Sequence, residues 1–202
     1  MVLTIIKRKP KVRRIPAYLV YEEMNGEALP YKGYLDVLAT TKKPEEIMGS
    51  SSLQAVFVSM IHAFIYFNLN RKKYLVATNE SGLHIGLNDN FANDIAIFEK
   101  EKITLNDKYF DVCPKVVIEV DIKVDLGETS WNSDLSYVVD KSQKMMDFGV
   151  GKLLWISTKH KKIFVIVPNE NWYFVNFDQD ILLLDGCTLN LAQLLADEEI
   201  EY

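Results

Sequence analysis

The chain has few of the residues that build disulfide-rich or zinc-stabilised folds. Its 202 residues include only two cysteines, Cys113 and Cys187, which lie far apart and outside any CxxC or Cys/His cluster. This spacing argues against a disulfide scaffold and against a zinc site. Glycine motifs are missing too. No Gly-x-Ser-x-Gly, P-loop or Rossmann pattern is present, so the enzyme classes that these motifs mark have no support.

Long apolar runs are also missing. The longest apolar segment, "LQAVFVSMIHAFIYF" at residues 53 to 67, carries Gln54, Ser59 and His62. It is shorter than the ~20 residues that a bilayer crossing requires, so a buried core helix is expected and no membrane partner. The segment "MVLTIIKRKPKVRR" has too short an apolar run for a secretory signal, and its basic cluster lies on the wrong side of that run. We therefore expect a cytoplasmic protein.

Positive charge is not in excess, since the formal net charge is −5. A nucleic-acid partner would have to be attracted by a local basic patch or by metal ions. The basic run "KRKPKVRR" at residues 7 to 14 either contacts a phosphate backbone or forms a solvated arm, and the sequence leaves both open. The length and the apolar fraction predict one domain over residues 1 to 202, with residues 1 to 16 as a basic N-terminal arm.

The apolar pattern predicts a mixed α/β (α+β) fold. Residues 17 to 39 are typical of β-structure with a turn at Asn25-Gly26, and a central helix is expected after Ser50. Short strand-like runs follow in "KYLVATN", "LHIGL" and "NDIAIFE", and the spacing of "DLSYVVDKSQKMMDFGV" is helical. Three more strands and a short C-terminal helix are expected in "KLLWIST", "KIFVIVP", "WYFVNF" and "LNLAQLLADEE". The result is a mixed central β-sheet flanked by helices, with an N-terminal hairpin.

The stretch "KVVIEVDIK" at residues 115 to 123 places charged side chains at one end of a strand. Alternation predicts that Glu119, Asp121 and Lys123 share a face. Neighbouring carboxylates repel unless a metal ion or a lysine lies near them. Asp94 precedes another strand-like run, and a hairpin would bring it beside Glu119. Oxygen ligands of this kind suit Mg²⁺ or Mn²⁺. The alternative is ordinary solvated carboxylates at a strand end.

Several motifs occur in an order that resembles a known family. "NDIAIF", "CPKVVIEVDIK", "DKSQKMMDFGV" and "KLLWIS" follow one another between about residues 83 and 167. The set resembles the Uma family of restriction-endonuclease-like proteins, a branch of the PD-(D/E)xK nuclease superfamily. In that family a strand Asp is followed by a strand ending in Glu-Val, and then by a helix with Lys-x-x-x-Tyr-x-x-x-Gly-Val. The leading segment "AYLVYEEMNGEAL" resembles the family's N-terminal hairpin.

The resemblance assigns roles to individual residues. Asp94 and Glu119 match the two metal-binding acids, and Lys141 matches the helix lysine. Two departures stand out: Lys115 follows Pro114 where an Asp is common, and Asp121 occupies the place of the superfamily's Glu-x-Lys lysine. The assisting lysine is therefore open between Lys123 and Lys141. Lys144 ranks below both, because it lies nearly opposite the apolar stripe of the helix.

The resemblance implies a restriction-endonuclease-like core and a Mg²⁺- or Mn²⁺-dependent endonuclease that hydrolyses DNA, with a homodimer as the expected assembly. Asp94 and Glu119 would hold the metal, a lysine would assist, and Asp121 would be an extra ligand or a salt-bridge partner. The alternative is a catalytically inactive domain of the same fold that binds nucleic acid or protein. Asp121 and the acidic net charge favour that alternative somewhat.

Overall fold

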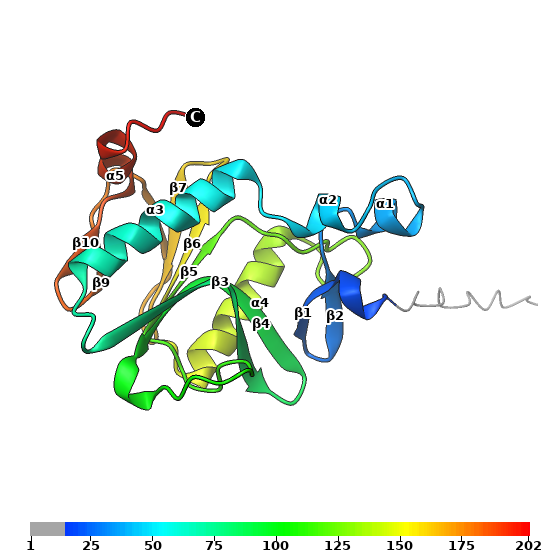
Figure 1. Cartoon of the computed structure of the whole chain (residues 1–202), viewed down its shortest axis with the longest axis horizontal. Helices are drawn as coiled ribbons and strands as arrows, with labels where there is room; N and C mark the ends of the chain where they lie inside the picture. The colour runs from blue at the N-terminus through cyan, green and yellow to red at the C-terminus, as the bar shows by residue number, and fades with distance from the viewer. Residues whose placement is uncertain (1–14) are drawn as a thin grey trace, which may run out of the picture.

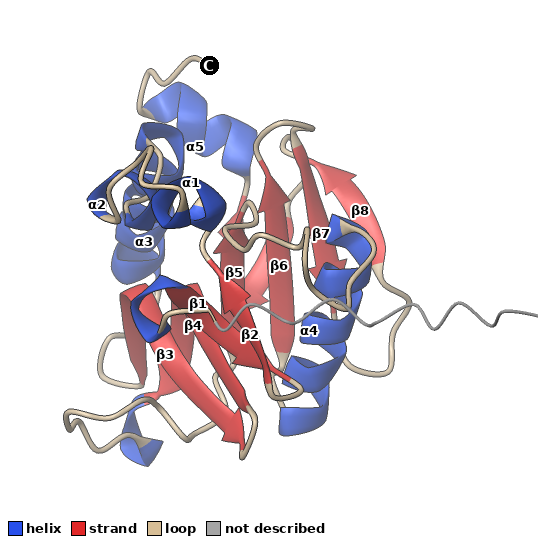
Figure 2. Ribbon diagram, turned by 90° about the vertical axis from the view of Figure 1, so that its right-hand side faces the viewer, coloured by secondary structure: helices blue, strands red, loops and turns tan. Residues whose placement is uncertain are grey.

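A computed structural model of the chain describes residues 15–202 (Figure 1). Its centre is an eight-stranded mixed sheet with the strand order β2-β1-β4-β5-β6-β7-β8, in which β3 pairs with the other edge of β4. Helices α3 and α4 cover opposite faces of the sheet (Figure 2). The expected fold class, a mixed sheet flanked by helices with an N-terminal hairpin, is confirmed. The basic run at residues 7 to 14 lies outside the described residues.

The N-terminal hairpin forms as predicted, but it is shorter than expected. After a 3-10 turn η1 (Ala17–Leu19), strands β1 (Val20–Met24) and β2 (Glu27–Pro30) pair in antiparallel fashion. The turn residues Asn25 and Gly26 have φ angles of 57° and 73°, which is the backbone that an Asn-Gly turn favours. The rest of the predicted β-segment is helical, because Gly33 at φ 85° starts α1 (Tyr34–Leu38). A second short helix, α2 (Glu45–Met48), follows.

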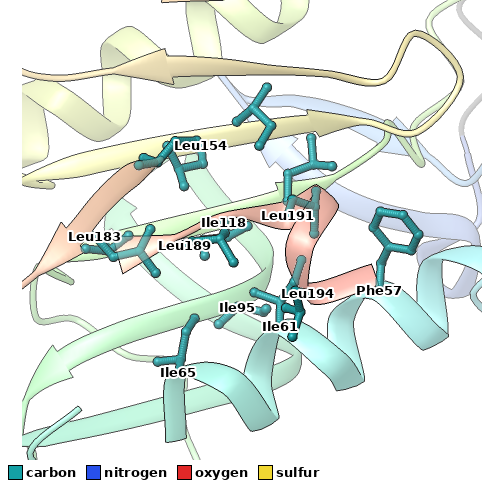
Figure 3. Close-up of a cluster of buried hydrophobic side chains, with 14 of the residues drawn as sticks. Phe57, Ile61, Ile65, Ile95, Ile118, Leu154, Leu183, Leu189, Leu191 and Leu194 are labelled. Carbon is teal, nitrogen blue, oxygen red and sulfur yellow. The ribbon is translucent and has the colours of Figure 1, made fainter. Parts of the chain in front are cut away.

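Helix α3 (Ser52–Asn68) begins at the predicted serines, where the Ser51 hydroxyl accepts a hydrogen bond from the Gln54 amide at 3.2 Å. Its side chains Phe57, Ile61 and Ile65 pack on the sheet (Figure 3). The expected core helix is buried on the side that faces the sheet, whereas Phe67 is 79% exposed on the other side. Among the described residues, no helix has the length and apolar character needed to span a membrane.

Strands β3 (Tyr74–Gly86) and β4 (Asp89–Glu99) form a long antiparallel hairpin. The two runs "KYLVATN" and "LHIGL", predicted as separate strands, are one strand interrupted by a bulge. At the bulge Asn79 and Glu80 have φ angles of 63° and 54°, and the register shifts between Thr78 and Ser81. A bulge turns neighbouring side chains toward new directions. Here it lies opposite Asp94. A 3-10 turn, η2 (Lys100–Lys102), follows β4.

The centre of the sheet is a parallel pair joined by a helix. Strand β5 (Val116–Val120) pairs with β6 (Lys152–Ser157), and α4 (Asp134–Phe148) connects them. Ser133 caps the start of α4, and Gly149 at φ 107° ends it, as the sequence predicts. Every residue of β5 is buried, because one face of the strand packs in the core under α3 and the other face packs in the core under α4.

The remaining elements complete the sheet and the α3 side. Strands β7 (Lys162–Ile166) and β8 (Tyr173–Asn176) continue the sheet in antiparallel fashion, with β8 at the edge. The short strands β9 (Ile181–Leu184) and β10 (Cys187–Leu189), which the sequence analysis missed, form a separate two-stranded sheet. Helix α5 (Leu191–Asp197) forms within the predicted C-terminal helical segment and packs in the same hydrophobic core as α3.

Candidate active site at the fork of the sheet

The candidate site lies where the sheet forks. On the edge that faces away from β3, strand β4 pairs with β1 through Asn90 and with β5 from Ile95 onward. The residues of β4 between these two pairings lie at the opening between β1 and β5. Strand β1 contributes Glu22 to this opening, β4 contributes Asp94 and β5 contributes Glu119. We call this place the sheet fork.

Lys141 of α4 reaches into the sheet fork and joins two of its acids. Its ammonium Nζ lies 2.9 Å from Glu22 Oε2 and 3.1 Å from Glu119 Oε1. The side chain is only 1% exposed. Tyr137, one turn earlier on α4, donates its hydroxyl proton to Glu22 Oε1. We call Glu22, Glu119, Lys141 and Tyr137 the Lys141 cluster. The structure therefore buries the ammonium of Lys141.

Burial and the neighbouring charges shift the pKa values of the Lys141 cluster. Burial and the neighbouring carboxylates of Asp94 and Glu22 outweigh the opposing effect of Lys141, and together they raise the pKa of Glu119 to about 8. For Lys141, burial alone would lower the pKa, but the carboxylates of Glu119 and Glu22 outweigh it and the pKa rises. Lys141 therefore stays a cation, and Glu119 takes up a proton at a higher pH than an exposed glutamate does.

Aromatic rings enclose the ammonium of Lys141. Its Nζ lies 5.3 Å from the ring centre of Phe91, 5.4 Å from that of Trp155 and 5.9 Å from that of Tyr137. These rings exclude water and favour a cation at this point. Burial and the neighbouring Glu22 raise the pKa of Tyr137, so its hydroxyl stays a proton donor.

Asp94 is next to Glu119 but is held by the other helix. The Asp94 amide donates to Glu119 Oε2 at 3.5 Å, which confirms that the two acids are neighbours. The Asp94 carboxylate accepts from the Val120 amide at 2.8 Å and from Gln54 Nε2 of α3 at 3.2 and 3.3 Å. Gln54 Nε2 also donates to the Val120 carbonyl at 2.8 Å. Asp94 thus contacts α3, whereas Glu119 contacts α4.

Lys123 binds the Asp94 side of the fork. Its Nζ lies 3.3 Å from Asp94 Oδ1 and 2.6 Å from Glu80 Oε1, and it donates to Ser50 Oγ at 3.1 Å. Burial lowers the pKa of Lys123, but Asp94 and Glu80 outweigh it, so the pKa is raised. We call Asp94, Glu80 and Lys123 the Lys123 cluster. It lines an open cavity of about 310 Å³, whose wall also includes the half-buried His62.

Asp121 does not share a face with Glu119, and that expectation is wrong. Strand β5 ends at Val120, and Asp121 adopts a left-handed backbone with φ 57°, which breaks the alternation. Its carboxylate accepts from the Thr158 amide at 3.0 Å and from the Thr158 hydroxyl at 2.6 Å. Asp121 therefore ties the end of β5 to the end of β6. Lys123 reaches the fork only because the chain has turned.

The donor chemistry of the sheet fork fits a hard divalent cation, although the side chains do not converge on one point. The carboxylates of Glu22 and Glu119 face the buried ammonium of Lys141, and Asp94 is the neighbour of Glu119 on β4. Glu119 Oε1 contacts the ammonium of Lys141 and accepts a hydrogen bond from no other group within residues 15–202. In the same part of the chain, no group of three His, Cys, Asp or Glu side chains is arranged to hold a metal ion. A cation would need small rotations of Asp94 or Glu119.

Four residues of the site were not found from the sequence: Glu22, Gln54, Glu80 and Tyr137. Glu22 looks like any polar residue of an alternating hairpin strand, and Gln54 and Glu80 carry no motif. Gln54 offered one signal, because an amide inside an apolar helix needs a partner when it is buried. Glu22 and Glu80 offered none, since only the fork and the bulge of β3 bring them to Lys141 and Lys123.

No protein-family model matches the chain, and no curated protein matches it. Among solved structures, the fold is similar to a crystal structure from Anabaena variabilis ATCC 29413, described as "a putative nuclease belonging to DUF820". The match covers 87% of this chain and 89% of that chain, with a TM-score of 0.59 and 14% sequence identity. This similarity establishes a shared fold across most of both chains.

Proposed function

We propose that the protein is a Mg²⁺- or Mn²⁺-dependent endonuclease that hydrolyses phosphodiester bonds of DNA, related to the Uma family and the PD-(D/E)xK superfamily. One observation carries the proposal. Acids from three strands and a lysine from α4 are buried together where the sheet forks. The shared fold with the Anabaena protein and the order of the sequence motifs support it.

Residues of the Lys141 cluster and of the Lys123 cluster have different roles in this proposal. Asp94 and Glu119 would hold the metal ion, which supplies charge neutralisation at the scissile phosphate and a lower pKa for a bound water. Lys141 positions Glu119 and, by its charge, favours the ionised form of that carboxylate. Lys123 lines the open cavity, so its ammonium is the one that stabilises negative charge developing on the phosphate. The burial of Lys141 supports this choice between the two lysines.

Replacing Glu119 by Gln tests the proposal. The variant should lose Mg²⁺-dependent cleavage of plasmid DNA and keep its fold, because the amide preserves the shape of the side chain and removes a carboxylate that is costly to bury. Glu23→Gln is the matched control, since it removes a half-buried acid from the same hairpin strand as Glu22. Unchanged cleavage by Glu119→Gln would overturn the assignment.

Calorimetric titration with Mn²⁺ tests the metal ligands separately from catalysis. The wild-type protein should bind Mn²⁺, and Asp94→Ala should bind it far more weakly. For a duplex substrate the proposal includes a homodimer, because cutting both strands calls for two copies of the site. Light scattering of the full chain gives the mass directly, and a monomer in the presence of duplex DNA would remove this part of the proposal.

A second candidate is a non-catalytic domain that binds nucleic acid or protein. The observation that favours it is the Lys141 cluster itself, in which an ammonium already lies between the carboxylates of Glu22 and Glu119. A structural ion cluster needs no metal. Absence of both Mn²⁺ binding and cleavage in the wild-type protein would support this candidate.

A further inference from the structure

A second cavity lies on the α4 side of the sheet, beyond the end of β5. It has a volume of about 470 Å³, which is in the range of small-molecule sites. Its apolar wall comes mainly from the aromatic rings of Trp155 on β6, Phe164 on β7 and Phe174 on β8. Figure 2 shows α4 beside these strands. We call it the aromatic cavity.

Two rings of the aromatic cavity, Phe164 and Phe174, are stacked, and Phe174 is open to solvent. Phe164 and Phe174 are paired across β7 and β8, with ring centres 4.4 Å apart and ring planes 15° from parallel. Phe174 is the outer ring of this stack and is 61% exposed. An exposed flat ring on a rigid strand offers a surface on which another flat ring stacks.

Unpaired cations surround the aromatic cavity. Lys32, Lys159 and Lys162 line it, and none of the three forms an ion pair with a carboxylate within residues 15–202. Two acids also line the cavity. The carboxylate of Asp121 already accepts two hydrogen bonds from Thr158, and Asp134 is exposed at the start of α4. Positive charge is therefore available around an aromatic surface, which complements a ligand that is both flat and anionic.

The aromatic cavity is adjacent to the Lys141 cluster through one side chain. Trp155 lies beside Glu119 in the parallel pairing of β5 and β6, and its ring is 5.4 Å from Lys141 Nζ. Its indole Nε1 donates to Ser142 Oγ of α4 at 3.0 Å, which fixes the ring. Trp155 is thus part of the wall of the aromatic cavity and also part of the surroundings of Lys141.

We propose that the aromatic cavity binds an unpaired nucleobase of the substrate strand, with the base stacked on Phe174 and the adjoining phosphates near the three lysines. This inference rests on the proposed function and narrows its substrate to nucleic acid with an unpaired base near the scissile bond, as in a single strand or at a frayed end. In a duplex the base edges are paired and its faces are stacked, so neither face is free for Phe174.

The experiment measures binding without cleavage. The probe is a fluorescein-labelled oligothymidylate of about twelve nucleotides, within the range that single-strand sites cover. Anisotropy is recorded in EDTA, so that no divalent cation is present. Wild-type protein should bind this strand more tightly than the same strand annealed to oligoadenylate. Phe174→Ala should bind it about 5- to 150-fold more weakly, and Phe174→Trp should restore binding.

Tyr173→Ala is the matched control, because Tyr173 is the exposed neighbour of Phe174 on β8 and does not line the aromatic cavity. It should bind like the wild type. Lys159→Ala and Lys162→Ala should each lower the salt dependence of binding by about 0.7 in slope. Equal binding by Phe174→Ala and the wild type would overturn the inference. So would a change from dimer to monomer in Phe174→Ala, which would assign the surface to a second copy.

The two proposals fail in different ways. If the wild-type protein cleaves DNA and Phe174→Ala binds the single strand normally, only the nucleobase site is wrong. If the wild type binds the single strand through Phe174 but never cleaves with Mg²⁺ or Mn²⁺, only the hydrolytic function is wrong.

Discussion

The Lys141 cluster and the Lys123 cluster share one charge pattern but differ in their surroundings. Each lysine lies between two carboxylates, Glu22 and Glu119 in one case and Asp94 and Glu80 in the other. Lys141 is 1% exposed and enclosed by aromatic rings, whereas Lys123 is 13% exposed and lines an open cavity. Solvent access therefore decides what the same ionic arrangement does. A ligand in the open cavity can contact Lys123, whereas the aromatic rings enclose the ammonium of Lys141.

Replacing Lys141 by Met should have the largest effect on stability. Methionine keeps the unbranched shape of the lysine stem, but the change leaves two buried carboxylates without their cation. This loss costs about 3–5 kcal/mol. Lys123→Met is the control and should cost about 1 kcal/mol, because Glu80 is partly exposed and Asp94 keeps its hydrogen bonds from Gln54 and the Val120 amide. Urea denaturation of both variants measures the difference, and equal losses would show that burial does not separate the two clusters.

The pH dependence of stability should be the next largest effect. Burial raises the pKa of Glu119 from 4.5 to about 8, so the folded state binds this proton more tightly than the unfolded chain. The stabilisation is fully present below about pH 4 and is lost as the pH rises through 8, by an amount on the order of a few kcal/mol. The stability of the Glu119→Gln variant should not show this loss as the pH rises through 8. Identical pH profiles between pH 5 and 9 would contradict the assignment.

Gln54→Met should have an intermediate effect. The variant keeps the volume of the side chain but removes the hydrogen bond to the buried Val120 carbonyl and one of the hydrogen-bond donors of Asp94, which costs about 1–3 kcal/mol. Gln143→Met on α4 is the control, because its amide only contacts the exposed Asp147. We expect thermal unfolding to separate the two variants clearly. Similar melting temperatures would mean that Gln54 does not tie α3 to the fork.

Lys144→Ala should have the smallest effect. Lys144 pairs with Asp89 at 2.8 Å, but both side chains are partly exposed and the pair is worth about 0–1 kcal/mol. Cleavage should be unchanged, since this lysine contacts neither cluster. A large loss of activity would mean that the lysine of the reaction has been assigned to the wrong residue of α4.

Much of the fold could be predicted from the sequence, because most of its elements carry local signals. The capped helix α4 has Ser133 at its start and Gly149 at its end, and Asn25-Gly26 marks the first turn. The errors are also physical. Gly33 starts a short helix inside a segment with β composition, and the bulge at Asn79 and Glu80 lets one strand continue through polar residues that resemble a turn.

The candidate site was harder to predict, because its geometry depends on nonlocal pairing. The sequence brought Asp94 and Glu119 together, since a hairpin strand next to a buried strand makes them neighbours. It misplaced Asp121, because alternation assumes that the strand continues, and a left-handed residue after Val120 ends it. It could not find Glu22, because nothing in the chain indicates that β4 pairs with both β1 and β5.

The separation of Glu22 and Lys141 along the chain, 119 residues, also bears on the order of folding. Contacts between distant segments form late, because closing a long loop costs entropy before any interaction rewards it. During synthesis, Glu22 and Glu119 leave the ribosome before Lys141 does. Until the helix that carries Lys141 docks, these two carboxylates repel each other and stay hydrated. Closure of the sheet fork should therefore be among the last events on the folding pathway.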